Sequence, residues 1–264
     1  MVYITEIKIP AKKINKLTRN IVQFLDQKSN SYYHVVNLNP ETYIFAIKDP
    51  SYKTIINHAN EILIDGIGIK ILAKIKGIPA GEKLAGTDFM LKLIALSVKR
   101  KERVMFLGGF GKTAMKAAAH FQEKYPFLKI ASFEGAKNIR SSSKQEESYA
   151  IELIHKFKPH YLFVAYGPPW QERWIYQHKD DLRGIVCMGV GGSFNFFSSK
   201  AIRAPVYVIK SNFEWLWRFI FEPVRTLKKG PTYIYFVIYS FFLFLSMLPS
   251  KICFRRRKIT EIKT

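Results

Sequence analysis

The chain has 264 residues, enough for one large α/β domain with an appendage or for two small domains. Hydrophobic residues make up 48% of it and aromatic residues 15%, which permits a packed core and excludes global disorder. The formal net charge of +22 indicates an anionic partner: a nucleic acid, an anionic membrane surface or a phosphorylated substrate.

The two cysteines point to a reducing compartment. Cys187 falls in an apolar run and Cys253 in a basic tail, and neither has the spacing of a metal ligand. Two cysteines cannot build a disulfide framework for a chain of this length. The N-terminus shows no apolar secretory segment, so we expect the main body of the protein in the cytoplasm.

Short apolar runs alternate with helical patterns along most of the chain. The runs predict strands at residues 34–38, 61–64, 104–107, 129–133, 161–166 and 184–188. The patterns between them predict helices at residues 21–26, 41–47, 52–60, 69–76, 89–99, 113–125 and 144–157. This alternation indicates βαβ units, so the predicted fold is an α/β structure with a mostly parallel sheet flanked by helices.

Glycine-rich turns follow three of the predicted strands, at residues 108–111, 167–169 and 189–192. Open parallel sheets bind ligands at the carboxyl ends of their strands, so these turns favour a nucleotide or sugar-phosphate site over ordinary connections. The first turn is not a Walker loop, because two residues rather than four separate Gly108 from Gly111-Lys112-Thr113. Backbone N–H groups at such a helix start can still hold a phosphate.

Polar residues near these turns have two interpretations each. Asp65 follows a strand and could act as a general base in the ligand crevice, or it could cap the next helix. Thr87 and Asp88 lie at a helix start, where capping is the ordinary role. Gln171 and Glu172 could bind a sugar or base, or they could be exposed residues of a first helical turn.

The pattern changes after Arg203-Ala204-Pro205. Residues 207–225 are helical and rich in aromatic side chains, and Lys228-Lys229-Gly230-Pro231 predicts a break. From Arg203 onward the chain carries twelve Lys or Arg residues against three Glu. We therefore predict two parts: an α/β core at residues 1–205, and a helical, basic and apolar appendage at residues 206–264.

The segment at residues 232–248 is uncharged and almost wholly apolar. It could be a buried core helix, a transmembrane span or a segment lying in the membrane interface. A span usually needs about 20 apolar residues, and this run is shorter. Its tyrosines, and the Lys and Arg residues that flank it on both sides, favour an interfacial segment on anionic lipid.

An ordered set of short motifs resembles the WecG/TagA/CpsF family of glycosyltransferases over roughly residues 30–228. The motifs are Asn39-Pro40-Glu41, Asp65-Gly66-Ile67-Gly68, Gly86-Thr87-Asp88, Phe106-Leu107-Gly108-Gly109, Gly167-Pro168-Pro169-Trp170-Gln171-Glu172, Gly189-Val190-Gly191-Gly192-Ser193-Phe194, Arg203-Ala204-Pro205, Glu214-Trp215-Leu216-Trp217-Arg218 and Glu222-Pro223-Val224-Arg225.

The resemblance implies a Rossmann-like enzyme that transfers an N-acetylmannosamine-type sugar from UDP to polyprenyl-diphosphate-linked N-acetylglucosamine. The transfer would be inverting and metal-independent, with no cofactor, and would serve a wall polymer or surface polysaccharide at the cytoplasmic face of the membrane. Asp65 would be the catalytic base, and Arg218 and Arg225 would complete the site over the leaving diphosphate. The predicted substrate-binding residues are Asn39, Thr87, Asp88, Gly108, Gly109, Gly111, Gln171, Glu172, Gly189, Gly191, Asn195 and Arg203.

Four positions depart from the family pattern. Asn37 stands where a threonine is usual, Asn195 where an aspartate is usual, Lys83 where an arginine is common and Ser199 where a glycine is common. These departures leave the donor open between N-acetylmannosamine, its uronic acid and another hexose. Whether the chain forms a homo-oligomer also stays open.

Two other classes of protein remain as alternatives. A basic nucleic-acid-binding protein would explain the charge, but the charges of the tail accompany a long apolar run rather than a compact reading module, so we expect no nucleic acid partner. A non-catalytic subunit that binds sugar nucleotides is the second alternative, and Asn195 motivates it.

Overall fold

A computed structural model describes residues 2–4, 6–10, 13–199, 201–211, 214–223, 227 and 229–245. Its centre is a six-stranded sheet with the order β4-β3-β8-β7-β5-β6, and each neighbouring pair of strands is parallel. This confirms the predicted α/β fold with a parallel sheet. The strands are β3 (Tyr33–Leu38), β4 (Glu61–Ile64), β5 (Arg103–Gly108), β6 (Lys129–Phe133), β7 (Tyr161–Ala165) and β8 (Val186–Gly189).

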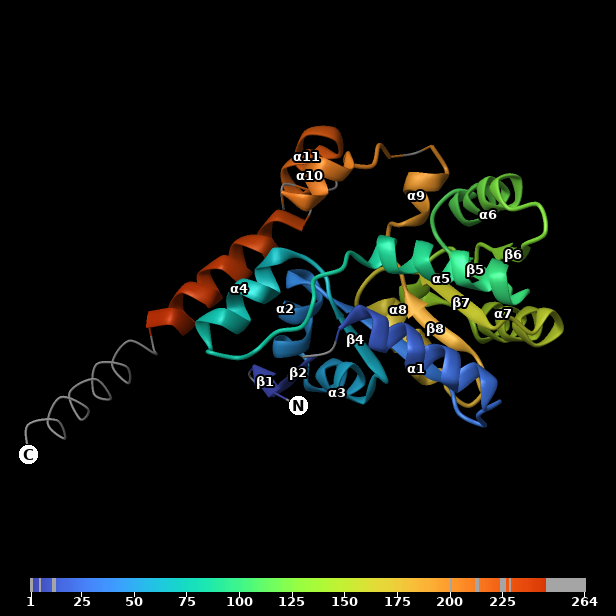
Figure 1. Cartoon of the computed structure of the whole chain (residues 1–264), viewed down its shortest axis with the longest axis horizontal. Coiled ribbons are helices and arrows are strands. Elements are labelled where there is room, and N and C mark those ends of the chain that lie inside the picture. Colours follow the sequence, from blue (N-terminus) through green and yellow to red (C-terminus); the bar gives the residue numbers. More distant parts are fainter. Residues whose placement is uncertain are drawn as a thin grey trace, which may run out of the picture.

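Helices cover both faces of the sheet (Figure 1). Alternate strand residues point to opposite faces. Phe106 and Phe163 therefore pack with α1, α5, α6 and α9, whereas Leu107 and Val164 pack with α7 and α8. At the β3–β4 side, α2, α3 and α4 complete the second face. The helices are α1 (Ile14–Asp26), α2 (Pro40–Lys48), α3 (Pro50–His58), α4 (Ile67–Ile75), α5 (Gly86–Arg100), α6 (Thr113–Lys124), α7 (Lys144–Phe157), α8 (Trp170–Gln177) and α9 (Phe194–Phe197).

A pair of three-residue strands precedes this core. β1 (Val2–Ile4) and β2 (Ile7–Ile9) pair antiparallel, and Ile7 and Ile9 are buried against α2, α3 and β4. The sequence predicts no element here, because three residues are too few to show a period.

The strand order places the ligand crevice. β8 lies between β3 and β7; the crossover from β3 to β4 leads to one edge of the sheet, and the crossover from β5 to β6 leads to the other. Such a switch point opens a crevice at the carboxyl ends of the central strands. The turns that follow β3, β7 and β8 meet there.

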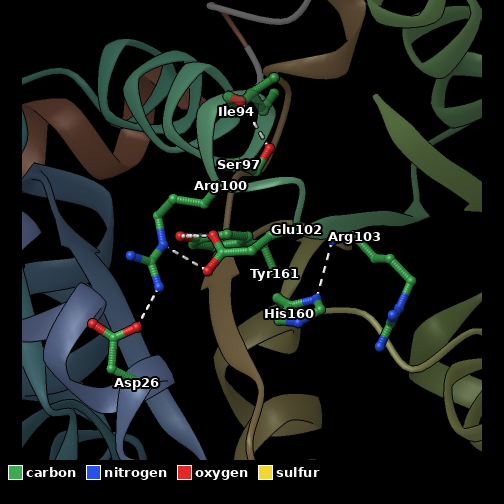
Figure 2. A network of polar contacts seen from close by, with 8 residues as sticks. All are labelled: Asp26, Ile94, Ser97, Arg100, Glu102, Arg103, His160 and Tyr161. Atoms are coloured by element: carbon green, nitrogen blue, oxygen red, sulfur yellow. Dashed lines mark hydrogen bonds and ion pairs between the residues drawn. The ribbon is translucent and has the colours of Figure 1, made fainter. Parts of the chain in front are cut away.

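The opposite, amino-terminal end of the sheet is held by a polar cluster shown in Figure 2. Arg100, at the end of α5, forms ion pairs with Asp26 of α1 and with Glu102 just before β5. Glu102 also accepts a hydrogen bond from the Tyr161 hydroxyl at 3.0 Å. These contacts fasten α1 and α5 to the starts of β5 and β7.

The C-terminal segment first leads away from the sheet and then packs against helices α2 and α4. α10 (Val206–Lys210) and α11 (Glu214–Phe221) are followed by residues 229–245, which are helical and are called the C-terminal helix here. The helix runs beside α4 in Figure 1. It continues through Gly230 and Pro231, where the sequence predicted a break. Packing against the core stabilises a helix that local propensity disfavours.

One face of the C-terminal helix packs on the core. The Phe236 ring is 7% exposed and meets the Tyr43 ring of α2 edge to face, and Tyr239 lies against the same ring. A Cβ atom added to Gly68 of α4 would lie 3.0 Å from the Phe236 ring, so this glycine lets the helix pack closely on α4. The interpretation as a core helix therefore describes this face, and the interpretation as an interfacial segment stays a prediction.

The other face of the C-terminal helix is exposed and apolar, with Ile234, Val237, Ile238, Phe241 and Phe242 turned to solvent. Within the described residues, no helix is both long enough and apolar enough to cross a membrane. Residues 246–248 of the predicted apolar segment and the basic cluster at residues 255–258 lie outside the described residues.

Candidate active site

A polar pocket with a cavity volume of about 90 Å³ lies at the carboxyl ends of β3, β4, β7 and β8 and opens partly to solvent. Five of the predicted functional residues line it, and they come from five separate segments. The lining residues are Asn37, Asn39, Glu41, Thr42, Asp65, Gly86, Thr87, Pro168, Gln171, Val190, Gly191, Gly192, Ser193, Phe196, Lys229 and Tyr233.

Asp65 is a half-buried carboxylate on the wall of this pocket. Its N–H donates to the carbonyl oxygen of Leu38 at 3.0 Å, which extends the pairing of β4 with β3 by one residue. Its Oδ2 accepts from the N–H of Gly86, the first residue of α5, at 3.3 Å. Gly66 stands at the N-cap of α4, and no side-chain bond caps that helix. The interpretation of Asp65 as a cap for the following helix was therefore wrong.

Asn39 and Asn37 shape the wall formed by β3 and α2. Asn39 is the N-cap of α2, and its Oδ1 accepts from the Thr42 N–H at 2.9 Å. Asn37 Nδ2 donates to the Gly189 carbonyl oxygen at 2.7 Å, which ties β3 to β8 where the strands end. The buried Oδ1 of Asn37 finds no partner in the described part of the chain. Its Nδ2 and Oδ1 would lie 2.4 and 2.9 Å from a Cβ on Gly86, so Asn37 requires a glycine there.

Gln171 and Glu172 are buried, at 4% and 0% exposure, so the alternative that they are solvated was wrong. Gln171 Oε1 accepts from the N–H groups of Gly167 at 3.1 Å and Gly191 at 2.9 Å. Gln171 Nε2 donates to Glu172 Oε1 at 2.7 Å, and the Tyr52 hydroxyl of α3 donates to Glu172 Oε2 at 3.0 Å.

Burial raises the pKa of Glu172 to about 7, against the hydrogen bonds from Gln171 and Tyr52, which lower that pKa. A Cβ on Gly189 would lie 2.5 Å from Gln171 Nε2 and 2.7 Å from Glu172 Oε1. Gly189 thus leaves room for this pair, and the Glu172 side chain lies behind the pocket wall rather than on it.

Thr87 and Asp88 are not the caps that the sequence suggested. α5 begins at Gly86 with Ala85 as its N-cap, so both residues lie in the first turn. The Thr87 hydroxyl bonds with the Ser193 hydroxyl at 2.9 Å, next to the pocket. Asp88 forms an ion pair with Arg203, which fastens the segment after α9 to α5. Neither Asp88 nor Arg203 lines the pocket.

The Gly108–Gly111 turn ends β5, beside β7, and does not line the pocket described above. A Cβ on Gly108 would lie 2.9 Å from the Tyr166 ring, and one on Gly109 would lie 2.3 Å from the Thr113 hydroxyl oxygen. Both glycines thus leave room for neighbouring side chains, Gly108 for Tyr166 and Gly109 for Thr113. Asn195 lies in α9, which follows the glycine turn after β8, and it also stands outside the pocket lining.

Comparison with known proteins identifies the family of this chain. The model of the "Glycosyl transferase WecG/TagA/CpsF family" matches residues 2–248. The chain belongs to this family of glycosyltransferases. Among its relatives are proteins of Staphylococcus aureus strains NCTC 8325 / PS 47, COL and MRSA252, each named N-acetylglucosaminyldiphosphoundecaprenol N-acetyl-beta-D-mannosaminyltransferase. Each is 30% identical to this glycosyltransferase over 223 residues, which cover 83% of this chain and 85% of the relative.

The two predicted arginines of the appendage have different outcomes. Arg218 lies on α11, and Arg225 falls outside the described residues. Instead, Lys229 and Tyr233 of the C-terminal helix line the pocket of this glycosyltransferase, and Lys229 forms an ion pair with Glu41 of α2. The sequence could not place Lys229, because its contact with Glu41 spans 188 positions and depends on how the helix docks.

Glu41 and Ser193 also line the pocket and were absent from the predicted set. Both could have been predicted from the sequence, because each lies inside a motif that carried the family resemblance. No group of three or more His, Cys, Asp and Glu side chains that could hold a metal ion occurs in the described ranges.

Proposed function

We propose that this glycosyltransferase moves N-acetylmannosamine from a UDP-sugar to N-acetylglucosamine on a polyprenyl diphosphate, in the synthesis of a wall polymer or surface polysaccharide. The names of the Staphylococcus aureus relatives support this sugar and this acceptor. The observation that carries the proposal is the position of Asp65 on the wall of a polar pocket at the switch point of the sheet.

In the proposed reaction, an acceptor hydroxyl attacks the anomeric carbon from the face opposite UDP. The new C–O bond forms as the bond to the UDP oxygen breaks, which inverts the anomeric configuration. Asp65 takes the hydroxyl proton, and UDP leaves with the electron pair. The Gly86 N–H holds one oxygen of Asp65, so the carboxylate keeps a fixed orientation while it acts as a base.

The leaving UDP needs stabilisation by positive charge or N–H groups. We assign this role to Arg218 and Arg225 of the appendage, without a metal ion. Lys229 brings a further positive charge to the pocket. The activity should therefore withstand EDTA, and truncation before Tyr207 should leave a core that binds UDP but transfers almost no sugar.

We further propose that residues 1–205 form the catalytic core and residues 206–264 an appendage that associates with the cytoplasmic face of the membrane. The exposed apolar face of the C-terminal helix supports this proposal. A lipid-linked acceptor stays at the membrane surface, so an enzyme held at that surface meets it at a high local concentration.

A panel of UDP-sugars, assayed with a synthetic lipid-diphosphate N-acetylglucosamine acceptor, tests the proposal. We expect a disaccharide product from UDP-N-acetylmannosamine, with the acceptor on the opposite anomeric face. Transfer of only the uronic acid or another hexose would change the donor but keep the class of reaction. Tight binding of a UDP-sugar without transfer to any acceptor would indicate a non-catalytic subunit.

A further inference from the structure

A buried chain of hydrogen bonds behind the pocket joins α3 to two of the turns at the carboxyl end of the sheet. It begins at Tyr52 of α3, whose hydroxyl is buried next to the first turn of α2. The Tyr52 hydroxyl donates to Glu172, and Glu172 accepts from Gln171. At the other end, Gln171 holds the N–H groups of Gly167 and Gly191.

The bonds of Gln171 determine which groups in this chain donate and which accept. Gln171 Oε1 accepts from two backbone N–H groups, so its Nε2 must donate to Glu172. Glu172 accepts from Gln171 on one oxygen and from Tyr52 on the other. An ionised carboxylate satisfies both donors, whereas a protonated one must donate through one of its oxygens.

We infer that Glu172 is a positioning residue for the donor site. Through Gln171, it holds the turn at Gly167–Pro169 and the turn at Gly189–Gly192 at a fixed spacing from Tyr52 of α3. It does not touch the substrate, because its side chain is completely buried and does not line the pocket. The part of this inference that concerns donor binding rests on the proposed function, whereas the part that concerns the turns does not.

The position of Glu172 makes the donor site sensitive to pH. The groups that face this carboxylate are the Tyr52 hydroxyl of α3, the Gln171 amide of α8 and the Glu41 carboxylate of α2, whose negative charge adds to the raised pKa of about 7. The ionised form, which accepts from both partners, is populated above that pH. As the pH falls through about 7, one of the two bonds must break or reverse, and the turns loosen.

Two variants of Glu172 and one matched control test the inference. Glu172→Met removes both hydrogen bonds but keeps a side chain of similar length. Glu172→Gln cannot titrate, and it can keep both bonds only if the Tyr52 hydroxyl accepts instead of donating. Glu102→Gln is the control, because Glu102 is also buried and also accepts from a tyrosine hydroxyl at 3.0 Å, but at the opposite end of the sheet (Figure 2).

The first measurement is hydrogen–deuterium exchange of peptides that contain Gly167 and Gly191, with all proteins at the same pH. We expect exchange to be about tenfold faster in Glu172→Met, because the loss of one hydrogen bond lowers protection against exchange by about that factor. Exchange in Glu102→Gln should be unchanged. Wild-type exchange rates at both glycines in Glu172→Met would overturn the inference. If Glu172→Met does not fold, Tyr52→Phe removes one of the two bonds and is read in the same way.

The second measurement is the dissociation constant of UDP-N-acetylmannosamine from about pH 5.5 to about 8.5, in an Asp65→Asn background so that Asp65 does not titrate. We expect binding to weaken as the pH falls through about 7 with Glu172 present, and to be intermediate and independent of pH with Glu172→Gln. An unchanged pH dependence in Glu172→Gln would overturn the role in donor binding. A wild-type enzyme without sugar transfer would refute the proposed function but leave the exchange result valid.

Discussion

At the scale of single residues, two carboxylates near the pocket lie in different environments. Asp65 is half-buried on the pocket wall, where one oxygen accepts from a backbone N–H. Glu172 is fully buried behind that wall and accepts from two side chains. Exposure to the pocket allows a carboxylate to take a proton from the substrate, whereas burial between two donors allows it to fix their positions.

Replacing Asp65 tests the proposed base. In Asp65→Asn, the carboxamide oxygen can still accept from the Gly86 N–H, so we expect the fold and UDP binding to persist. The side chain can no longer take a proton, and loss of a general base reduces kcat by about 10²–10⁴-fold. The measurements are turnover with saturating acceptor and UDP binding by calorimetry. Near-normal turnover would show that the base is another residue.

The pKa of Glu172 also predicts how stability depends on pH. In the unfolded chain this group has an ordinary pKa of 4.5, and in the folded protein the pKa is about 7. Between these values the folded state binds a proton that the unfolded state has released. The contribution of Glu172 to the free energy of unfolding therefore falls as the pH rises, by on the order of 3 kcal/mol in total.

Urea unfolding of wild-type protein and Glu172→Gln at about pH 5 and about pH 8 measures this contribution, because the variant lacks the titration. We expect the variant to gain stability relative to wild type at the higher pH. Equal differences at both pH values would show that the carboxyl group does not titrate on folding. The ionised form that orders the pocket is thus the form that is costly to bury.

At the scale of elements, apolar periodicity located the sheet closely. The predicted strands at residues 61–64 and 129–133 match β4 and β6, because a short buried run bounded by turns has few alternative placements. The starts of α1 and α5 were predicted too late, whereas α6 and α7 begin at the predicted residues. The first two turns of α1 are mostly polar and α5 begins at a glycine, so the local apolar pattern does not mark where these helices start.

Residues of the candidate site could be predicted only where the local sequence itself marks a strand end or a helix start. Asn39, Asp65 and Gln171 stand at strand ends or helix starts, and the structure brings them to one pocket. Lys229 and Tyr233 reach the same pocket because Phe236 docks the C-terminal helix between α2 and α4. A contact of that kind depends on two surfaces that are distant in the sequence.

Removing the docking ring tests this arrangement. Phe236→Ala should free the C-terminal helix from α2, because burial of a phenylalanine is worth about 3–5 kcal/mol. We expect faster proteolysis within residues 229–245, and a kcat/KM reduced by about tenfold or more as Lys229 and Tyr233 leave the pocket.

Phe241→Ala is the matched control for this change, since Phe241 is on the same helix but exposed. It should alter neither proteolysis nor activity with a soluble, short-chain acceptor. Equal activity of Phe236→Ala and wild type would show that docking of the helix does not serve the pocket.

At the scale of the whole molecule, charge and apolar surface are both concentrated towards the C-terminus. From Arg203 onward, basic residues outnumber acidic ones by twelve to three, and the C-terminal helix exposes a row of apolar side chains. An amphipathic helix with nearby cations binds anionic membranes through both contributions. The same helix contributes Lys229 and Tyr233 to the pocket, so the surface proposed to bind lipid adjoins the proposed active site.

Deleting residues 233–258 tests the membrane role. We expect the shortened protein to move from the membrane fraction to the soluble fraction. If apolar contact dominates, full-length protein should need detergent for release, whereas charge alone predicts release by high salt. Full-length protein that stays soluble without detergent and does not bind anionic liposomes would contradict the proposal.

The position of β8 has a consequence for biosynthesis. Among the described strands of the sheet, β8 is the last to be made, yet it lies in the middle between β3 and β7. Until residues 186–189 have left the ribosome, β3–β4 and β7–β5–β6 are separate pieces, each with an unpaired edge that can join a neighbouring chain. A nascent or truncated product that stops before β8 therefore carries two aggregation-prone edges and none of the Gly189–Gly192 turn.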